Sequence, residues 1–299
     1  MALEYRGNMI NQSNFRNIFS NKSQDILDEI ELAILYDTQI GVYIDRCGED
    51  WLKLSQIRKS IRSFIPKKYI STGLSANVIG KFRELYLDGY DLSYFDKYLT
   101  ATKGVGSVSL LNDSKLYDIL CTYQMNSNIT KIDFRTVKTD IFEPIIKGVR
   151  QGYPMWIITD SDVDLDKQTV TVLTKTMSRG INIFPFLSGG WNSEQIALIC
   201  ANVEKSDINN LMELINPRFT VDQLSVIIHV VKYPDALKAI CVTDSDGDPL
   251  YNYYQMYELS LCVNHGIDIS EIADPSISDK VMEDYFEKHK KEGEKNNKN

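Results

Sequence analysis

The chain has 299 residues, of which 43% are hydrophobic and 25% charged, proportions typical of a folded protein rather than a disordered one. Its net charge of -8 argues against nucleic-acid binding by the whole surface. No apolar run approaches the length of a membrane span, and the N-terminus lacks a signal-peptide core. The five scattered cysteines have no CxxC spacing and predict buried free thiols in a reducing compartment. We therefore expect a cytoplasmic protein.

The first 22 residues are rich in asparagine and stand apart from the pattern that follows. Phe15, Ile18 and Phe19 are spaced to form a short amphipathic helix. Since the outer unit of a stacked array has no neighbour on one side, it needs a cover. We predict that residues 1–22 form this N-terminal cap.

A helical repeat begins at Ser23. Each unit has apolar residues at an anchor position, three residues later and, in all units but the last, seven residues later. These spacings follow the 3.6-residue turn and predict one buried stripe on each helix. The ten anchors are Leu27, Leu54, Ile79, Leu116, Phe142, Val170, Ile196, Leu224, Met256 and Met282.

Helix starts are marked by capping residues four positions before each anchor. Nine of the ten units have Ser, Thr, Asp or Asn there, and only Lys138 departs. An apolar residue precedes this position in eight units, as a hydrophobic staple with the anchor requires. Three complete capping boxes are predicted, Asn192 with Gln195, Thr220 with Gln223, and Asn252 with Gln255.

Helix ends are predicted ten residues after the anchor, where five units have glycine or asparagine. A shorter apolar segment follows in most units, and Ala101–Ser107 adds a flexible insertion. The predicted fold is all-α, an elongated α-solenoid of about ten helix–turn–short-helix units of 25–37 residues. It forms a single domain over 23–287, and the charged segment 288–299 is expected to be a flexible tail.

The linker that runs from Gly266 to Pro275, Gly-Ile-Asp-Ile-Ser-Glu-Ile-Ala-Asp-Pro, resembles a linker of uncharacterised helical-repeat proteins from bacteria, phages and mobile elements. Their linker reads Gly-Leu-Asp-Val-Ser-x-Tyr-Ala-Asp-Pro, and the stretch from Asn216 to Leu224 is similar to the start of their next helix. The resemblance is sharpest from about residue 190 onward. It implies an all-α array without known activity, and an accessory role such as inhibiting a host defence protein.

Candidate catalytic and metal motifs are weak. The Asp-rich loops at 160–166 and 244–248 begin like calcium loops, but both lack Gly at position 6 and Glu at position 12. They lie where other units have inter-repeat turns, so a turn is the favoured interpretation and a bound cation the alternative. The three histidines lie in different units, and no phosphate loop or nucleophile elbow occurs. The chain is predicted to be no enzyme and to need no cofactor.

Charge is unevenly distributed along the chain. Nine Lys or Arg stand between Arg46 and Arg83 against two acids, whereas Asp244 to Asp284 is strongly acidic. The basic region indicates a surface that binds a partner, with an ordinary solvated face as the alternative interpretation. The partner expected there is a protein, and nucleic acid is the alternative. The basic and acidic regions of two copies could also associate with each other. The candidate residues here are Lys53, Arg58, Lys59, Arg62, Lys67 and Lys68.

Tyr253, Tyr254 and Tyr257 cannot all face the core together with the staple residue Tyr251, so they are expected to point outward. Exposed tyrosines often anchor protein interfaces, although packing on the neighbouring loop is the alternative. The predicted function is therefore non-enzymatic binding of a protein. A nucleic-acid binder that uses region 46–83 and an enzyme with an unrecognised site stay open as alternatives.

Overall fold

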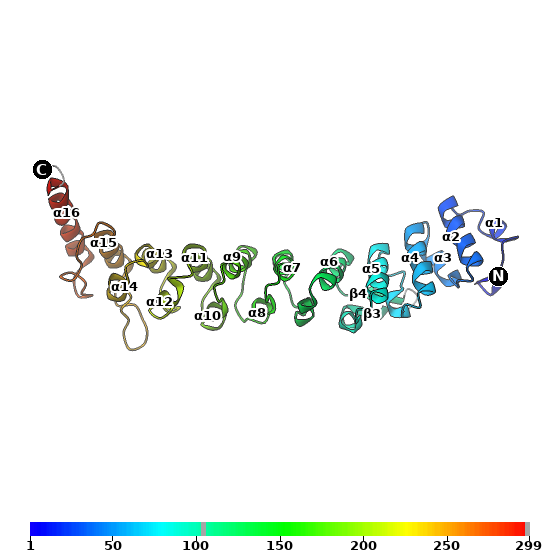
Figure 1. Cartoon of the computed structure of the whole chain (residues 1–299), viewed down its shortest axis with the longest axis horizontal. Coiled ribbons are helices and arrows are strands. Elements are labelled where there is room, and N and C mark those ends of the chain that lie inside the picture. The colour runs from blue at the N-terminus through cyan, green and yellow to red at the C-terminus, as the bar shows by residue number, and fades with distance from the viewer. Residues whose placement is uncertain (103–105, 297–299) are drawn as a thin grey trace. The chain divides into compact units, whose positions relative to one another are not determined.

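A computed structural model describes residues 1–102 and 106–296, with side chains for 1–102 and 106–291. The described chain is mostly helical (Figure 1), as the sequence predicts, and has two short antiparallel sheets. None of its described helices is long and apolar enough to cross a membrane.

Each predicted anchor lies in a long helix. These helices are α2 (Gln24–Leu35), α4 (Trp51–Arg62), α5 (Ala76–Leu87), α6 (Asp113–Met125), α7 (Phe142–Arg150), α9 (Lys167–Ser178), α11 (Ser193–Asn202), α13 (Val221–Val230), α15 (Tyr253–Asn264) and α16 (Asp279–Asn296). The shorter helices are α1 (Phe15–Ile18), α3 (Gly41–Cys47), α8 (Trp156–Thr159), α10 (Phe184–Ser188), α12 (Ile208–Met212), α14 (Pro234–Ile240) and the 3-10 helices η1 (Lys67–Tyr69), η2 (Ser93–Tyr98) and η3 (Ser127–Lys131). The strands are β1 (Leu3–Tyr5), β2 (Asn8–Ile10), β3 (Leu99–Thr102) and β4 (Gly106–Ser109).

The predicted caps are largely confirmed. In eight helices the capping side chain accepts the backbone N–H three residues later, and the three predicted capping boxes are complete. There are two exceptions: Ser23 precedes α2 but its side chain accepts no such bond, and α7 begins at Phe142, so Lys138 does not cap it. Asn126 is extended, with φ at -153°, and caps η3 rather than ending α6 in a left-handed conformation.

The predicted buried stripe holds at the anchor and three residues later, where only Leu27 and Tyr285 are not fully buried. Seven residues after the anchor the prediction is partly wrong, because Tyr86 is 40% exposed. The residue one place earlier, Leu85 in that helix, is buried instead. A helix with neighbours on two sides buries a wider arc than one stripe, and this brings the preceding position into the core.

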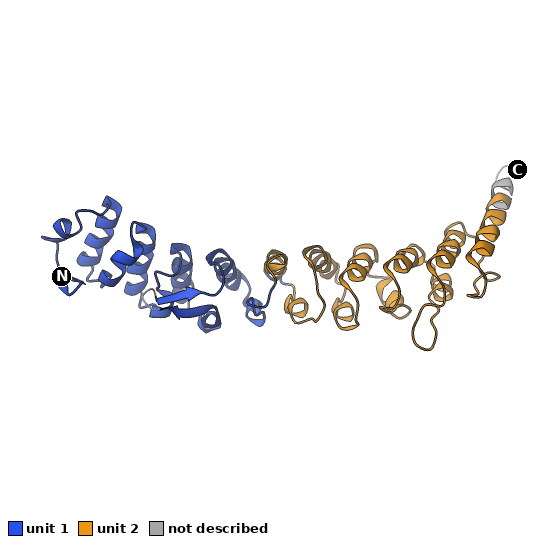
Figure 2. Cartoon of the chain, turned by 180° about the vertical axis from the view of Figure 1, so that it is seen from behind, with its two compact units in different colours: residues 1–137, 149–152 blue, residues 138–148, 153–299 orange. Residues whose placement is uncertain are grey.

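The described chain divides into two compact units, where the sequence indicates one domain over 23–287. The first is Met1–Val137 with Val149–Gly152, and the second is Lys138–Gly148 with Tyr153–Asn299. Within the first unit α2, α4, α5 and α6 pack one on the next (Figure 2). Within the second unit the same holds for α9, α11, α13, α15 and α16.

Both ends of the chain carry structure that the sequence did not indicate. Helix α1 forms as predicted, but β1 and β2 precede it as a hairpin in which Leu3 pairs with Ile10. Helix α16 continues to Asn296, into the segment expected to be a flexible tail. Lys and Glu are strong helix formers, and Lys291 pairs with Glu287 one turn away at 3.7 Å.

The short second segments are helical in most units and extended or turned in others. The insertion Ala101–Ser107 was expected to be flexible, but its described residues belong to strands β3 and β4, where Ala101 pairs with Ser107; residues 103–105 lie outside the described chain. The segment 267–273 forms turns instead of a helix. There the Asp268 carboxylate accepts the backbone N–H and hydroxyl of Ser270, which competes with helical hydrogen bonding.

The capping-box glutamines also join successive units. The Gln195 Oε1 accepts the Asn192 N–H at 3.0 Å, while its Nε2 donates to the carbonyls of Pro217 and Phe219 at 3.0 and 2.7 Å. Those carbonyls belong to the linker that enters the next long helix. Gln195 is only 4% exposed, so water cannot replace these bonds.

The same bridge recurs in the two units that follow. The Gln223 Nε2 donates to the Tyr251 carbonyl at 2.9 Å. The Gln255 Nε2 donates to the carbonyls of Pro275 and Ile277 at 3.0 and 2.7 Å. In each of these three repeats one buried amide thus caps the start of its own helix and holds the linker to the next.

Replacing Gln195 with leucine should lower the free energy of unfolding by about 2–3 kcal/mol, because buried linker carbonyls lose their donors. Gln195→Glu should be at least as damaging, since a carboxylate cannot donate to them. Urea unfolding measures both. The exposed Gln168 on α9 is the matched control, and Gln168→Leu should change stability by less than about 0.5 kcal/mol. Equal effects at the two sites would contradict the bridge.

Candidate binding surfaces

The structure buries one of the predicted partner-binding cations. Arg58 is 5% exposed, and its Nε donates to the Glu29 Oε2 at 2.7 Å between α4 and α2. Since both charges lie in the interior of the first unit, Arg58 holds these helices together and is not available to a partner. The prediction for this residue is therefore wrong.

Two further candidates are engaged with carboxylates of the same unit. Lys53 is half-buried and lies 3.7 Å from the Asp50 carboxylate, and Lys68 pairs with Asp96 at 2.6 Å. Lys67 is exposed. The basic region read from the sequence is thus much less basic in space.

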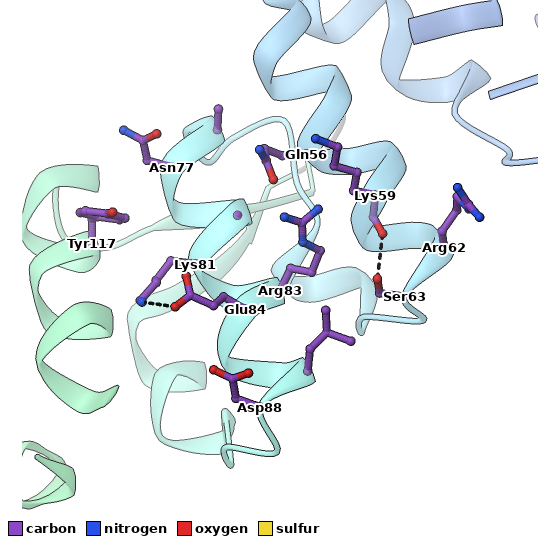
Figure 3. A pocket seen from close by; sticks show the side chains of 13 residues that line it. Gln56, Lys59, Arg62, Ser63, Asn77, Lys81, Arg83, Glu84, Asp88 and Tyr117 are labelled. Carbon is purple, nitrogen blue, oxygen red and sulfur yellow. Dashed lines mark hydrogen bonds and ion pairs between the residues drawn. The ribbon is translucent and has the colours of Figure 1, made fainter. Parts of the chain in front are cut away.

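Lys59 and Arg62 lie on the exposed side of α4, where they line a groove of about 660 Å³ (Figure 3). The groove crosses α5 and reaches Tyr117 of α6. Its other charged residues are Lys81, Arg83, Glu84 and Asp88, all on or just after α5. The Arg62 guanidinium also lies over the Tyr36 ring, 4.0 Å from its centroid.

A glycine opens the floor of this groove. A Cβ at Gly80 would lie 3.1 Å from the Gln56 Oε1, so a side chain there would fill the space between α4 and α5. The Gln56 Oε1 is buried and, like the Ser60 Oγ, has no hydrogen-bond partner in the described structure. Buried polar atoms are rarely left unpaired, so Gln56 is unusual.

The two α5 cations differ in their surroundings. The Lys81 Nζ donates to the Glu84 Oε1 at 2.7 Å and to the Gln124 Oε1, and the Gln124 Nε2 donates to the same Glu84 oxygen at 3.0 Å. The hydrogen bonds from Lys81 and Gln124 lower the pKa of Glu84. Arg83 is half-buried and takes part in none of the ion pairs found among the described residues. Burial, followed by repulsion from Arg58, lowers the pKa of Arg83.

Tyr253, Tyr254 and Tyr257 form a second candidate surface on α15. They are 36%, 65% and 43% exposed, which agrees with the expected outward orientation. The ring centroids of Tyr253 and Tyr254 lie 5.3 Å apart, and Tyr253 stacks on Tyr257 at 6.2 Å. The rings order one another and present a preformed aromatic patch, which we call the tyrosine patch.

Carboxylates lie beside the tyrosine patch. Burial, followed by repulsion from Glu283, Asp279 and Glu287 of α16, raises the pKa of Glu258. Glu258 follows Tyr254 by four residues on α15 and therefore lies on the same side of the helix. The surroundings of the patch are negative.

The Asp-rich loops act as turns. The Asp244 Oδ1 accepts the N–H groups of Asp246 and Asp248, each at 2.9 Å, and Asp166 caps α9. Asp248 also pairs with Arg218 at 2.8 Å. Across the part of the chain that the structure describes, no group of three or more potential metal ligands comes together.

The cysteines are free thiols, and four of the five are buried. Burial raises the pKa of Cys200 and of Cys241 to about 12, which keeps both protonated at neutral pH. Such thiols are poor nucleophiles.

The chain matches no protein-family model, no curated protein and no solved structure with which it was compared.

Arg58→Met should lower the free energy of unfolding by about 3–5 kcal/mol, because the Glu29 carboxylate is left buried without its partner. Arg58→Met with Glu29→Leu should recover much of this loss. Lys59→Met, next in sequence but exposed, should change stability by less than about 0.5 kcal/mol. Thermal and urea unfolding measure all three. A stable Arg58→Met protein would show that the pair is not structural.

Native protein should react slowly with iodoacetamide at Cys47, Cys200, Cys241 and Cys262, because burial both blocks access and raises the pKa of each thiol to about 11 or 12. Cys121 is half-buried and is the thiol expected to react first. Mass spectrometry of labelled peptides measures the order. In urea all five should react alike, and fast native labelling of Cys200 would contradict its burial.

Proposed function

We propose that the chain is a non-enzymatic helical-repeat protein that binds another protein in a reducing, cytoplasmic compartment. In this proposal its repeats stack as an α-solenoid, and recognition occurs on side chains that the stack leaves exposed. A rigid array of helices can bind a partner with little loss of conformational freedom, which favours recognition.

Repeated contacts support the proposed architecture. The long helices α2, α4, α5 and α6 of the first compact unit, and α9, α11, α13, α15 and α16 of the second, each pack on the next, and each glutamine bridge spans 20 to 28 residues, close to one repeat. Local contacts of this kind are typical of repeat proteins, whose units contact their neighbours in sequence.

The observation that carries the binding proposal is the tyrosine patch. Three tyrosines are exposed on one helix, and their mutual contacts fix their orientation before any partner arrives. Tyrosine loses little side-chain entropy on binding and is enriched among the residues that contribute most to protein interfaces. Packing within the second compact unit does not explain these tyrosines, because their rings remain up to 65% exposed.

The resemblance of the linker at 266–275 extends this proposal. Helical-repeat proteins of phages and mobile elements carry a similar linker, so we propose that the partner is a host protein, such as a defence component, which the chain inhibits or adapts. This step rests on the resemblance alone.

The test is affinity capture from a lysate of the source cells, with the full chain as bait and mass spectrometry as readout. Proteins captured by the unchanged chain should be lost when Tyr253, Tyr254 and Tyr257 are all replaced with alanine. Tyr86→Ala removes a comparably exposed tyrosine from another helix and is the matched control. An identical set of captured proteins from the triple variant, or none from the unchanged chain, would refute the proposal.

A further inference from the structure

The basic region of the first unit has few cations that are free to meet a ligand. Arg58, Lys53 and Lys68 lie against Glu29, Asp50 and Asp96. The cations that line the α4–α5 groove without a carboxylate among the described ion pairs are Lys59, Arg62 and Arg83. Ligand binding in this region therefore centres on the groove.

Arg83 is the groove cation whose charge is disfavoured by its surroundings. Its guanidinium is half-buried near the charge of Arg58, and both circumstances disfavour the charged form. Arg58 is paired with Glu29, whereas Arg83 is in none of the described ion pairs and has only the attraction of Glu84, which itself pairs with Lys81. An incoming anion would give Arg83 a partner.

The groove has an open floor, and the Arg83 side chain lies beside it. In Figure 3 the Arg83 side chain lies on the α4 side of α5 beside Gln56 and Lys59, while Lys81 points the other way toward Glu84. Gly80 leaves the floor open next to Gln56. The Gln56 Oε1 beside this floor has no hydrogen-bond donor, and a carboxylate ligand could bond to Gln56 only through its NH2 group, after rotation about the terminal bond.

We propose that the α4–α5 groove binds a carboxylate side chain from an acidic segment of the protein partner, an inference that rests on the proposed function. The planar Arg83 guanidinium takes the carboxylate in a bidentate pair, and the Gln56 amide donates to the same group from the floor. Lys59 and Arg62 lie along the α4 wall, where they attract further acidic residues of the segment.

The groove suits an acidic peptide better than a nucleic acid. A phosphate backbone needs a continuous row of cations, yet Glu84 and Asp88 interrupt the lining, and Lys68 outside the groove is paired with Asp96. A peptide places its carboxylates at intervals and can keep them away from these two acids. The net charge of -8 further disfavours a nucleic-acid ligand.

Fluorescence anisotropy at low salt tests the proposal, with a labelled peptide of alternating Glu and Ser as the probe. It should bind the full chain, and the same peptide with Gln in place of Glu should not. Arg83→Met keeps the length of the side chain and should weaken binding at least about tenfold, as the loss of a charge-assisted pair predicts. Lys67→Met removes an exposed charge outside the groove and should leave binding unchanged.

Gly80→Leu tests the shape separately from the charge, because it fills the floor and keeps every cation. It should also weaken binding at least about tenfold, with circular dichroism and the melting temperature confirming that the variant folds. If Gly80→Leu fails to fold, Gly80→Ala is used, since alanine suits a helix better and its Cβ still lies 3.1 Å from the Gln56 Oε1.

Three results would overturn the proposal. These are absence of Glu-peptide binding at low salt, equal weakening by Lys67→Met and Arg83→Met, and tighter binding of single-stranded DNA that depends on Arg83. Tyr254→Ala should leave the peptide affinity unchanged. Peptide binding without capture of any cellular protein would therefore refute the proposed function alone, and capture through the tyrosine patch without peptide binding would refute the groove alone.

Discussion

The fold depends on the hydrogen bonds that each capping-box glutamine donates to the linker of the next repeat, because the same side chain caps its own helix and positions the following one. In an isolated helix the N-terminal amide groups need a cap, and a box of Asn or Thr with Gln supplies it. In this chain the glutamine is buried by the following linker, and its second polar group must then find a partner there. Gln195 finds two carbonyls and Gln255 finds two more, so capping one helix also places the start of its neighbour.

The cap and the bridge that each glutamine makes differ in how well they can be predicted from sequence. The cap is a matter of residues three apart, and Asn192–Gln195 is readable by eye. The bridge joins Gln223 to Tyr251 across 28 residues, and nothing in their spacing marks them as partners. The same limit explains Arg58. A charged residue is ordinarily exposed, but position 58 faces α2, and Glu29 lies 29 residues earlier in the chain.

The candidate groove could be predicted only in part for a related reason. Lys59 and Arg62 stand out as charges, but the floor depends on a side chain that is missing. A glycine inside a helix reads as a weak point of the helix, and only the packing of α4 beside Gly80 turns it into space for a ligand. The exposure of Tyr253, Tyr254 and Tyr257 can be predicted from sequence, because Tyr251 occupies the staple position and the other three rings must then point away from the core.

Arg83 and Gln56 give the physical argument for a ligand at this groove. A half-buried guanidinium without a carboxylate and a buried amide oxygen without a donor both destabilise the folded chain. The two lie beside the same glycine floor, where replacing Arg83 with an apolar residue would remove the cost at once. Stability therefore does not explain the groove. In the proposed complex a bound carboxylate would pair with Arg83, and this attraction would offset the cost of leaving the guanidinium half-buried.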